Sequence, residues 1–255
     1  MATYKKRGFK PKTKAEKVEA IEENSTTAEV FNTLDETASR TEEWAVKNQK
    51  NIFIVVGIVA AIVLGYLGYN KFIAEPKASV AMNEMFTAQK YFNEAVNGTN
   101  KDSLYNLALK GGEGKFGLLE IIDEYSGTPA ANLANYYAGM AYLNTNDYQN
   151  AIKYLQEFDT DNEAVGPIAK GGIGDAFAQL NQPENALEYY EKAIALSNEN
   201  MFTTPMYLFK AANIAMTLGK ADKALKYYTR IKEEFSDATE ATNIDVFIGK
   251  AEASL

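Results

Sequence analysis

The alternation of apolar and charged positions stops near residue 50. From Ile52 to Tyr69, eighteen consecutive residues carry no charge. A helix of that length spans about 27 Å, close to the ~30 Å hydrocarbon core of a bilayer. About fifty residues precede the run, which is too many for a cleavable signal. The pattern therefore predicts a transmembrane helix over residues 51–73. The alternative is a helix buried in a soluble core, although such helices usually keep a polar stripe.

Small residues recur on one face of this predicted span. Gly57, Ala61 and Gly65 are four residues apart, and small residues at this spacing let a second membrane helix approach closely. We therefore expect a helix-packing face at these three positions. The alternative is that they are incidental, because glycine and alanine are common in membrane helices.

The segment before the span divides into two parts. Residues 1–27 are first basic and then acidic with few apolar side chains, which predicts a disordered tail. Apolar residues at helical spacing then predict a juxtamembrane helix over residues 28–50. Basic segments stay in the cytoplasm, so we expect the tail inside and the C-terminal part outside. The cations could also contact anionic lipid or the ribosome, or only fix the topology.

The part after the span repeats itself. Residues 136–158 align with residues 171–193 at an offset of 35, and residues 209–231 follow at an offset of 38. Each copy predicts two helices joined by a short turn. Gly139, Gly174 and Ala212 share one position in the first helix, where only a small side chain lets the two helices cross closely. The glycines of "GGIG" (171–174) are accordingly expected to be structural.

This pattern resembles the tetratricopeptide repeat, which has a Gly/Ala and an aromatic in its first helix and an Ala and an aromatic in its second. The resemblance implies an all-α chain, in which one N-terminal transmembrane helix precedes a helical solenoid. Residues 79–126 look like a degenerate first repeat, and residues 127–255 would hold the repeats and a C-terminal capping helix.

Composition argues against catalysis. The chain contains no histidine and no cysteine, which removes the commonest general base, the commonest zinc ligand and thiolate chemistry. Two short motifs resemble ligand loops. "KGGEGKFG" (110–117) lacks the Ser or Thr of a phosphate loop, and "DTDNE" (159–163) lacks the glycine and glutamate of a calcium loop. We expect no enzyme and no cofactor. The net charge of −8 argues against general nucleic-acid binding.

First helices of stacked repeats build an extended concave surface. The resemblance places the following residues on that surface: Leu133, Tyr136, Met140, Asn144, Ile168, Asp175, Gln179, Met206, Phe209, Asn213 and Met216. Methionines adapt to varied partners, so this set suits extended or partly folded polypeptide. The alternative is that some of these side chains only pack the repeats together.

The whole layout is similar to the YfgM-type ancillary subunit of the bacterial Sec translocon, which has a basic tail, one membrane helix and an acidic periplasmic repeat domain. The "EYSGTPAANLA" stretch (124–134) resembles that family's junction into its second repeat. The resemblance implies a chaperone-like subunit in the inner membrane, with the translocon and a membrane-anchored chaperone as partners. The alternatives are a structural adaptor of another envelope assembly, for secretion, division or outer-membrane biogenesis, and a repeat adaptor facing the cytoplasm.

Overall fold

The computed structural model describes residues 26–196 and 199–255, with side chains from residue 37 onward. These residues form helices and no strand, apart from one isolated bridge between Gly112 and Lys115. The expected all-α class is therefore confirmed. The chain divides into two compact units between Tyr69 and Asn70.

The described part of the first unit is one long helix, α2 (Thr26–Tyr69). It passes without a break through the expected juxtamembrane segment and the whole uncharged run from Ile52 to Tyr69, and it starts two residues before the expected position 28. The predicted span continues to residue 73, and its last four residues lie beyond α2. Its apolar window has no residue buried in the protein, which argues against a helix in the core of this chain. By length and composition, α2 can cross a membrane. The expected disordered tail lies, up to residue 25, outside the described residues.

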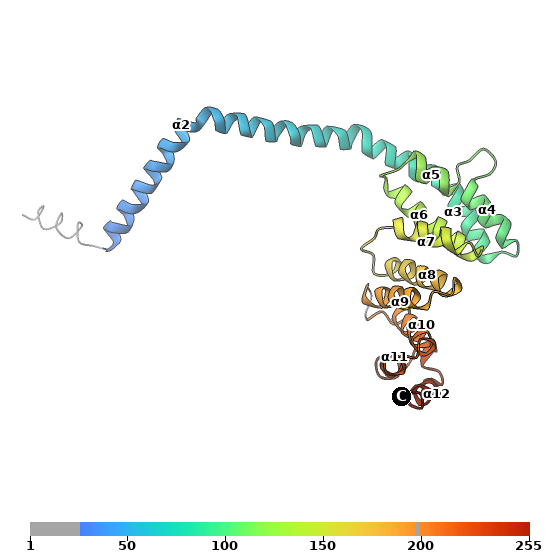
Figure 1. Ribbon diagram of the computed structural model, residues 1–255. Helices are drawn as coiled ribbons and strands as arrows, with labels where there is room; N and C mark the ends of the chain where they lie inside the picture. Colours follow the sequence, from blue (N-terminus) through green and yellow to red (C-terminus); the bar gives the residue numbers. More distant parts are fainter. Residues whose placement is uncertain (1–25, 197–198) are drawn as a thin grey trace, which may run out of the picture. The chain divides into compact units, whose positions relative to one another are not determined.

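The second unit begins with a π-helical turn, η1 (Asn70–Ala74), and continues as a series of helices that follow one another in chain order (Figure 1). They are α3 (Glu75–Asn97), α4 (Lys101–Lys110), α5 (Leu118–Glu124), α6 (Pro129–Asn144), α7 (Tyr148–Glu157), α8 (Val165–Gln179), α9 (Pro183–Leu196), α10 (Thr203–Thr217), α11 (Ala221–Glu234), the 3₁₀ turn η2 (Thr239–Ala241) and α12 (Ile244–Glu252).

Three helix pairs, α6/α7, α8/α9 and α10/α11, share the same turn. Asn146, Asn181 and Gly219 occupy the same place after the first helix, and each has a positive φ, of 62°, 57° and 69°. The next residue's N–H then bonds back to a carbonyl five residues earlier, as Asp147 does to Tyr142. This is the Schellman ending, which favours Gly or Asn at the left-handed residue.

The two helices of each pair cross at the small residue that the alignment identified. A Cβ on Gly139 would lie 2.5 Å from Cγ of Leu155, and one on Gly174 would lie 2.6 Å from the Tyr190 ring. The alanines early in the second helices (Ala151, Ala186 and Ala224) are fully buried. Close crossing therefore depends on these positions, as the sequence predicted.

The ends of the stack are built differently. The segment expected to be a degenerate first repeat holds α3, α4 and α5, and α3 packs against α4 and also against α6. At the other end, α12 packs on α11. There, Phe247 meets Phe209 edge to face at 4.9 Å between ring centroids. The last pair thus has its apolar side covered.

Candidate protein-binding surface

The first helices α6, α8 and α10 are neighbours in space, because α8 contacts both of the others. The predicted surface residues all lie on these three helices. Eight of them are half-buried: Leu133, Tyr136, Met140, Ile168, Asp175, Met206, Phe209 and Met216. Three are exposed: Asn144, Gln179 and Asn213. The predicted set therefore mixes half-buried side chains, all apolar except Asp175, with exposed amides.

Much of the apolar set also packs between helices. Tyr136 and Met140 lie against the buried cluster of Leu155, Phe158, Ala169 and Ile173. Leu133 packs on the cluster built by α3 to α6. Met206, Phe209 and Met216 pack on the cluster of the last two repeats. These side chains therefore pack between helices, and their role in binding a partner stays a prediction.

The amides differ in how they are used. Asn144 donates from Nδ2 to the carbonyl of Met140, one turn earlier. Asn213 accepts a hydrogen bond from the Tyr228 hydroxyl through Oδ1, at 2.7 Å. Gln179 is exposed at the end of α8.

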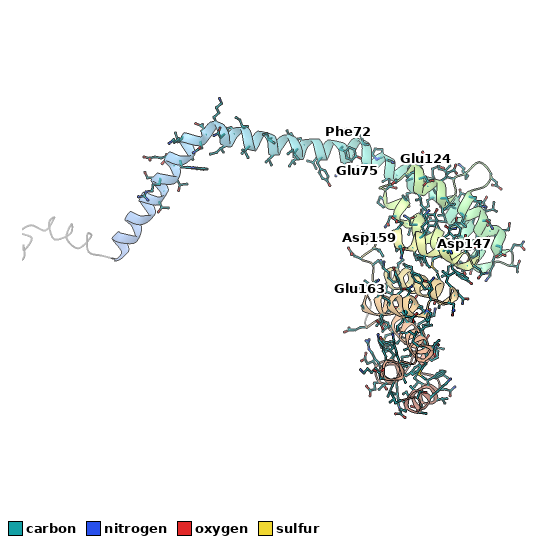
Figure 2. All side chains as sticks on the ribbon, viewed as in Figure 1. Phe72, Glu75, Glu124, Asp147, Asp159 and Glu163 are labelled. Atoms are coloured by element: carbon teal, nitrogen blue, oxygen red, sulfur yellow. The ribbon has the colours of Figure 1, made fainter. Side chains whose placement is uncertain are left out.

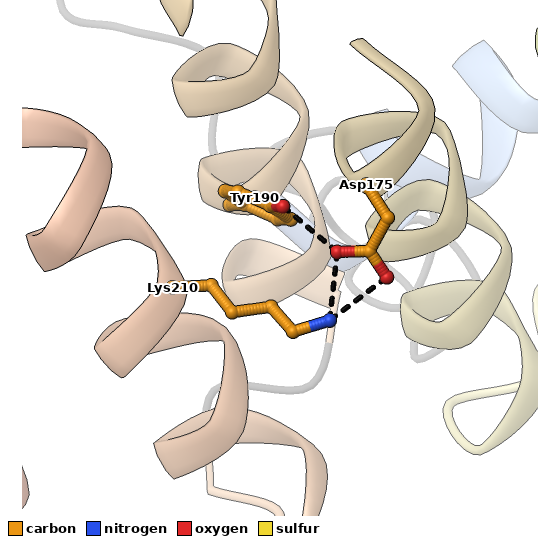
Figure 3. Close-up of polar contacts among 3 residues, drawn as sticks. All are labelled: Asp175, Tyr190 and Lys210. Carbon is orange, nitrogen blue, oxygen red and sulfur yellow. Dashed lines mark hydrogen bonds and ion pairs between the residues drawn. The ribbon is translucent and has the colours of Figure 1, made fainter. Parts of the chain in front are cut away.

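Asp175 lies at the centre of a polar network that links two repeats (Figure 3). Its Oδ1 accepts from the Tyr190 hydroxyl at 2.8 Å, and Nζ of Lys210 lies 2.7 and 2.8 Å from its two carboxylate oxygens. Burial, and then the nearby carboxylate of Asp175, raises the pKa of the Tyr190 hydroxyl well above its usual range. The network therefore holds a neutral phenol and a paired ammonium against one carboxylate.

Repeat symmetry explains half of this network. Asp175 and Tyr190 are fifteen residues apart, and so are Asn213 and Tyr228 of the next repeat, which form the equivalent hydrogen bond. In the preceding repeat these positions are Met140 and Leu155, which pack without polar contact. The sequence analysis included Asp175 and missed Lys210. No repeat signal marks Lys210, because these two repeats are offset by 38 residues and the equivalent of Asp175 is Asn213.

A glycine of α8 makes room for an aromatic ring of α10. A Cβ on Gly171 would lie 2.0 Å from the Tyr207 ring, whereas one on the adjacent Gly172 would lie 3.2 Å from Leu155. Burial raises the pKa of the Tyr207 hydroxyl well above its usual range, and Asp175 adds to this. The "GGIG" glycines are structural, as expected, and Gly171 serves the junction between repeats.

The second helices are linked along the chain by a separate set of hydrogen bonds. Gln156 on α7 donates to the Tyr189 hydroxyl on α9 at 2.8 Å. One repeat later, the Tyr227 hydroxyl on α11 donates to Glu191 on α9 at 2.7 Å, and Lys223 pairs with the same carboxylate. Burial and this hydrogen bond raise the pKa of Tyr227 above its usual range.

The two short motifs form loops. Asp159 and Glu163 lie in the connection between α7 and α8 (Figure 2). Both the N–H and the carbonyl of Asp159 bond to the side chain of Asn132. Within the described residues, no three His, Cys, Asp or Glu side chains converge to hold a metal ion. Gly111 and Gly114 adopt positive φ in the loop after α4.

The predicted membrane-packing face of α2 is open in this chain. Gly57, Ala61 and Gly65 are exposed, and a Cβ on either glycine would meet no atom within 4 Å. A role for this face in binding another helix stays a prediction.

Comparison with known proteins places the repeats. Two tetratricopeptide repeat models match the chain, one at residues 169–200 and the other at residues 133–161 and 207–238. No curated protein matches the sequence. A crystal structure of nearly identical TPR-like repeats from Podosopora anserina, described as a kinesin light chain, is similar with a TM-score of 0.49 and 12% identity. That likeness covers 69% of this chain and 87% of the other. The matched segments coincide with the three helix pairs, so this chain carries tetratricopeptide repeats, which form a protein–protein interaction module.

Proposed function

We propose that the chain is a membrane-tethered module whose α6/α8/α10 surface binds extended or partly folded polypeptide. The observation that supports this most is the composition of the surface, where half-buried methionines and aromatics alternate with exposed amides. Methionine adapts its shape to different side chains, and an amide can both donate to and accept from a peptide backbone. Such a surface suits segments that differ in sequence.

The charges on this surface are already paired, which bears on the class of segment that would bind. Lys210 is held by Asp175, and its ammonium also lies 5.9 and 5.7 Å from the centroids of Tyr190 and Tyr207. A ligand carboxylate would have to compete with Asp175 for this ammonium. The surface is therefore better suited to neutral internal segments than to a charged chain end.

The cellular setting is also part of the proposal. The module would sit in the inner membrane with its tail in the cytoplasm and its repeats in the periplasm. It would act as a chaperone-like accessory subunit of the Sec export channel, beside a membrane-anchored chaperone. The support is the resemblance in layout, together with the ability of α2 to span a bilayer.

Site-specific photocrosslinking tests the binding surface. A photoreactive residue replaces Gln179, which is exposed at the end of α8, or the matched control Lys226, which is exposed on the second helix α11. Gln179 should crosslink to chains in transit and to subunits of the export channel, and Lys226 should give far less of both. Equal crosslinking from the two positions would refute the surface. Crosslinks from Gln179 to another envelope assembly alone would refute the Sec assignment.

Topology has its own test. Protease added to intact spheroplasts should digest the repeats beyond about residue 80 and spare the tail. A protected repeat region would reverse the orientation and make the chain a cytoplasm-facing adaptor.

A further inference from the structure

A second site lies on the other side of α6. An open cleft of about 670 Å³ is bounded by α5, by the turn into α6, by α6 itself and by α7. On α6 its wall is formed by Pro129, Ala131, Asn132 and Asn135, and it includes none of the predicted protein-binding residues. Asn135 lies about 160° around the helix from Leu133, at 100° per residue. The cleft is thus distinct from the surface proposed above.

The cleft occurs at the one junction where the second helices are not bridged in the way described above. Tyr154 on α7 is the repeat equivalent of Tyr189 and Tyr227, which are 35 and 73 residues further along. Those two hydroxyls bond to Gln156 and Glu191 of the preceding second helix. The residue 35 before Gln156 is Ile121, which is buried and apolar. No hydrogen bond equivalent to the two bridges joins Tyr154 to α5 in the described structure.

Acceptors predominate among the polar groups around the cleft. Oδ1 of Asn135 is buried and has no hydrogen-bond partner in the structure. The carboxylates of Asp123, Glu157 and Asp159 line the cleft and take part in none of the ion pairs of the described side chains. A buried acceptor without a partner is unfavourable until a donor reaches it. The cleft therefore calls for a ligand that is rich in donors and positively charged.

Two cations at the cleft pair with none of these carboxylates among the described side chains. Nζ of Lys77 donates to the carbonyl of Ser126 at 3.5 Å. Nζ of Lys153 lies 4.9 Å from the centroid of the Tyr154 ring, an arrangement in which a cation is attracted to the ring face. Asn132 is engaged by the backbone of Asp159. The Tyr154 ring also stacks on Tyr142, at 5.5 Å between ring centroids. Three carboxylates and one amide oxygen thus remain for a ligand. A guanidinium matches this set, because it brings five N–H donors in one plane.

We propose that this cleft binds an arginine side chain presented by a partner polypeptide. Arginine fits better than lysine because its planar fork can bond a carboxylate and the Asn135 amide oxygen at the same time. The proposal does not depend on the export-channel assignment or on the α6/α8/α10 surface.

A ligand-observed NMR titration tests the proposal. The full chain in nanodiscs of zwitterionic lipid is mixed, at physiological ionic strength, with the peptide Gly-Gly-Arg-Gly-Gly, or with the same peptide carrying citrulline, lysine or glutamate at its centre. Citrulline keeps the shape of arginine and removes its charge. We expect the arginine peptide to bind about tenfold more tightly than the citrulline peptide, the ratio that one charge-assisted contact gives. The lysine peptide should lie between them, and the glutamate peptide should not bind.

Matched variants locate the binding. Asp123→Asn with Glu157→Gln should abolish the preference for arginine over citrulline, and both side chains are exposed, so folding should be unaffected. Glu184→Gln with Asp222→Asn changes the net charge equally at exposed positions outside the cleft and should leave the preference intact. Asn135→Leu should weaken arginine binding and raise the melting temperature. Equal binding of arginine and citrulline peptides, or equal loss in both double variants, would overturn the proposal.

Discussion

The two junctions between complete repeats join the same kinds of helix and differ in their chemistry. Where the first pair meets α8, the contact is apolar: Met140, Leu155 and Phe158 pack against α8, and Gly172 admits the Leu155 side chain. Where the second pair meets α10, Asp175, Tyr190 and Lys210 form a polar network, and Gly171 admits the Tyr207 ring. The junction between two repeats can thus be filled by apolar side chains or by hydrogen-bonded polar ones, provided that the space is filled and every buried polar group has a partner.

The apolar junction has geometric tolerance that the polar one lacks. At the first junction a flexible leucine faces Gly172, whereas at the second a buried ring with 3% exposure faces Gly171. A leucine can adjust by a rotamer change, but a buried ring cannot move without displacing its neighbours. Neighbouring glycines of one helix should therefore respond in opposite ways to the same substitution.

The largest expected effect separates these two glycines. Gly171→Ala forces a Cβ into the Tyr207 ring and should lower the free energy of unfolding by about 2 kcal/mol, because overpacking exceeds the gain in helix propensity. Gly172→Ala should be neutral or stabilise by up to about 1 kcal/mol. Chemical denaturation of both variants measures the difference. Equal destabilisation would mean that Tyr207 does not pack on Gly171.

Alkaline pH should act on the polar junction. The buried hydroxyls of Tyr190 and Tyr207 have raised pKa values in the folded state, while an unfolded tyrosine ionises near pH 10. Above about pH 10 the unfolded state loses these protons first, so stability should fall by up to about 1.4 kcal/mol per pH unit for each tyrosine. Below about pH 10 the two hydroxyls are protonated in both states, so they do not make stability depend on pH.

The Tyr190→Phe variant isolates the contribution of Tyr190 to the loss of stability at alkaline pH. The free energy of unfolding, measured with denaturant between about pH 9 and about pH 11, should decline less steeply in this variant than in the parent chain. This range brackets the usual tyrosine pKa near 10. An unchanged decline would mean that Tyr190 ionises as readily in the folded state as in the unfolded one.

A smaller effect distinguishes the bridged second helices from the unbridged one. Tyr227→Phe removes a hydroxyl bonded to Glu191 and should cost about 1 kcal/mol of stability, the usual range for such a bond. Tyr154→Phe removes the equivalent hydroxyl at the α5–α7 cleft, where no such bridge forms, and should change stability by less than about 0.3 kcal/mol. Thermal melts compare the two variants directly. A larger loss for Tyr154→Phe would reverse the comparison.

The smallest effect concerns the ion pair itself. Asp175 and Lys210 are each about one-third exposed, at 33% and 36% of their side chains, so solvent screens their attraction. A double-mutant cycle with Asp175→Asn and Lys210→Met should give a coupling energy of about 0.5 kcal/mol that declines as salt is added. A coupling that does not respond to salt would indicate a packing effect instead of an electrostatic one.

The fold was largely predictable from the sequence because the repeat constraints are local. The position shared by Gly139 and Gly174 is fixed by a crossing inside one helix pair, and the turn residues Asn146 and Asn181 by one backbone conformation. Each constraint acts within about 35 residues and recurs, so an alignment of the chain with itself is enough to show it.

The contacts between repeats were less accessible. The pairing of Asp175 with Lys210 depends on the angle at which α10 follows α8. The amide oxygen of Asn135 has no partner because α5 offers it no hydrogen-bond donor. Neither leaves a periodic mark in the sequence. The sequence alone also left open whether residues such as Phe209 pack between helices or face a partner. In the structure Phe209 is half-buried and packs on Tyr228 and Phe247.

The glycines of α8 have a consequence for motion. Gly171, Gly172 and Gly174 lie in the interior of one fifteen-residue helix, and each weakens an isolated helix by about 1 kcal/mol relative to alanine. Helix α8 therefore holds its shape mainly through α9 and α7. Its amides should exchange with solvent hydrogen sooner than those of α9 or α11. A polypeptide lying across α6, α8 and α10 would slow that exchange. Binding could therefore be detected as increased protection of the α8 amides.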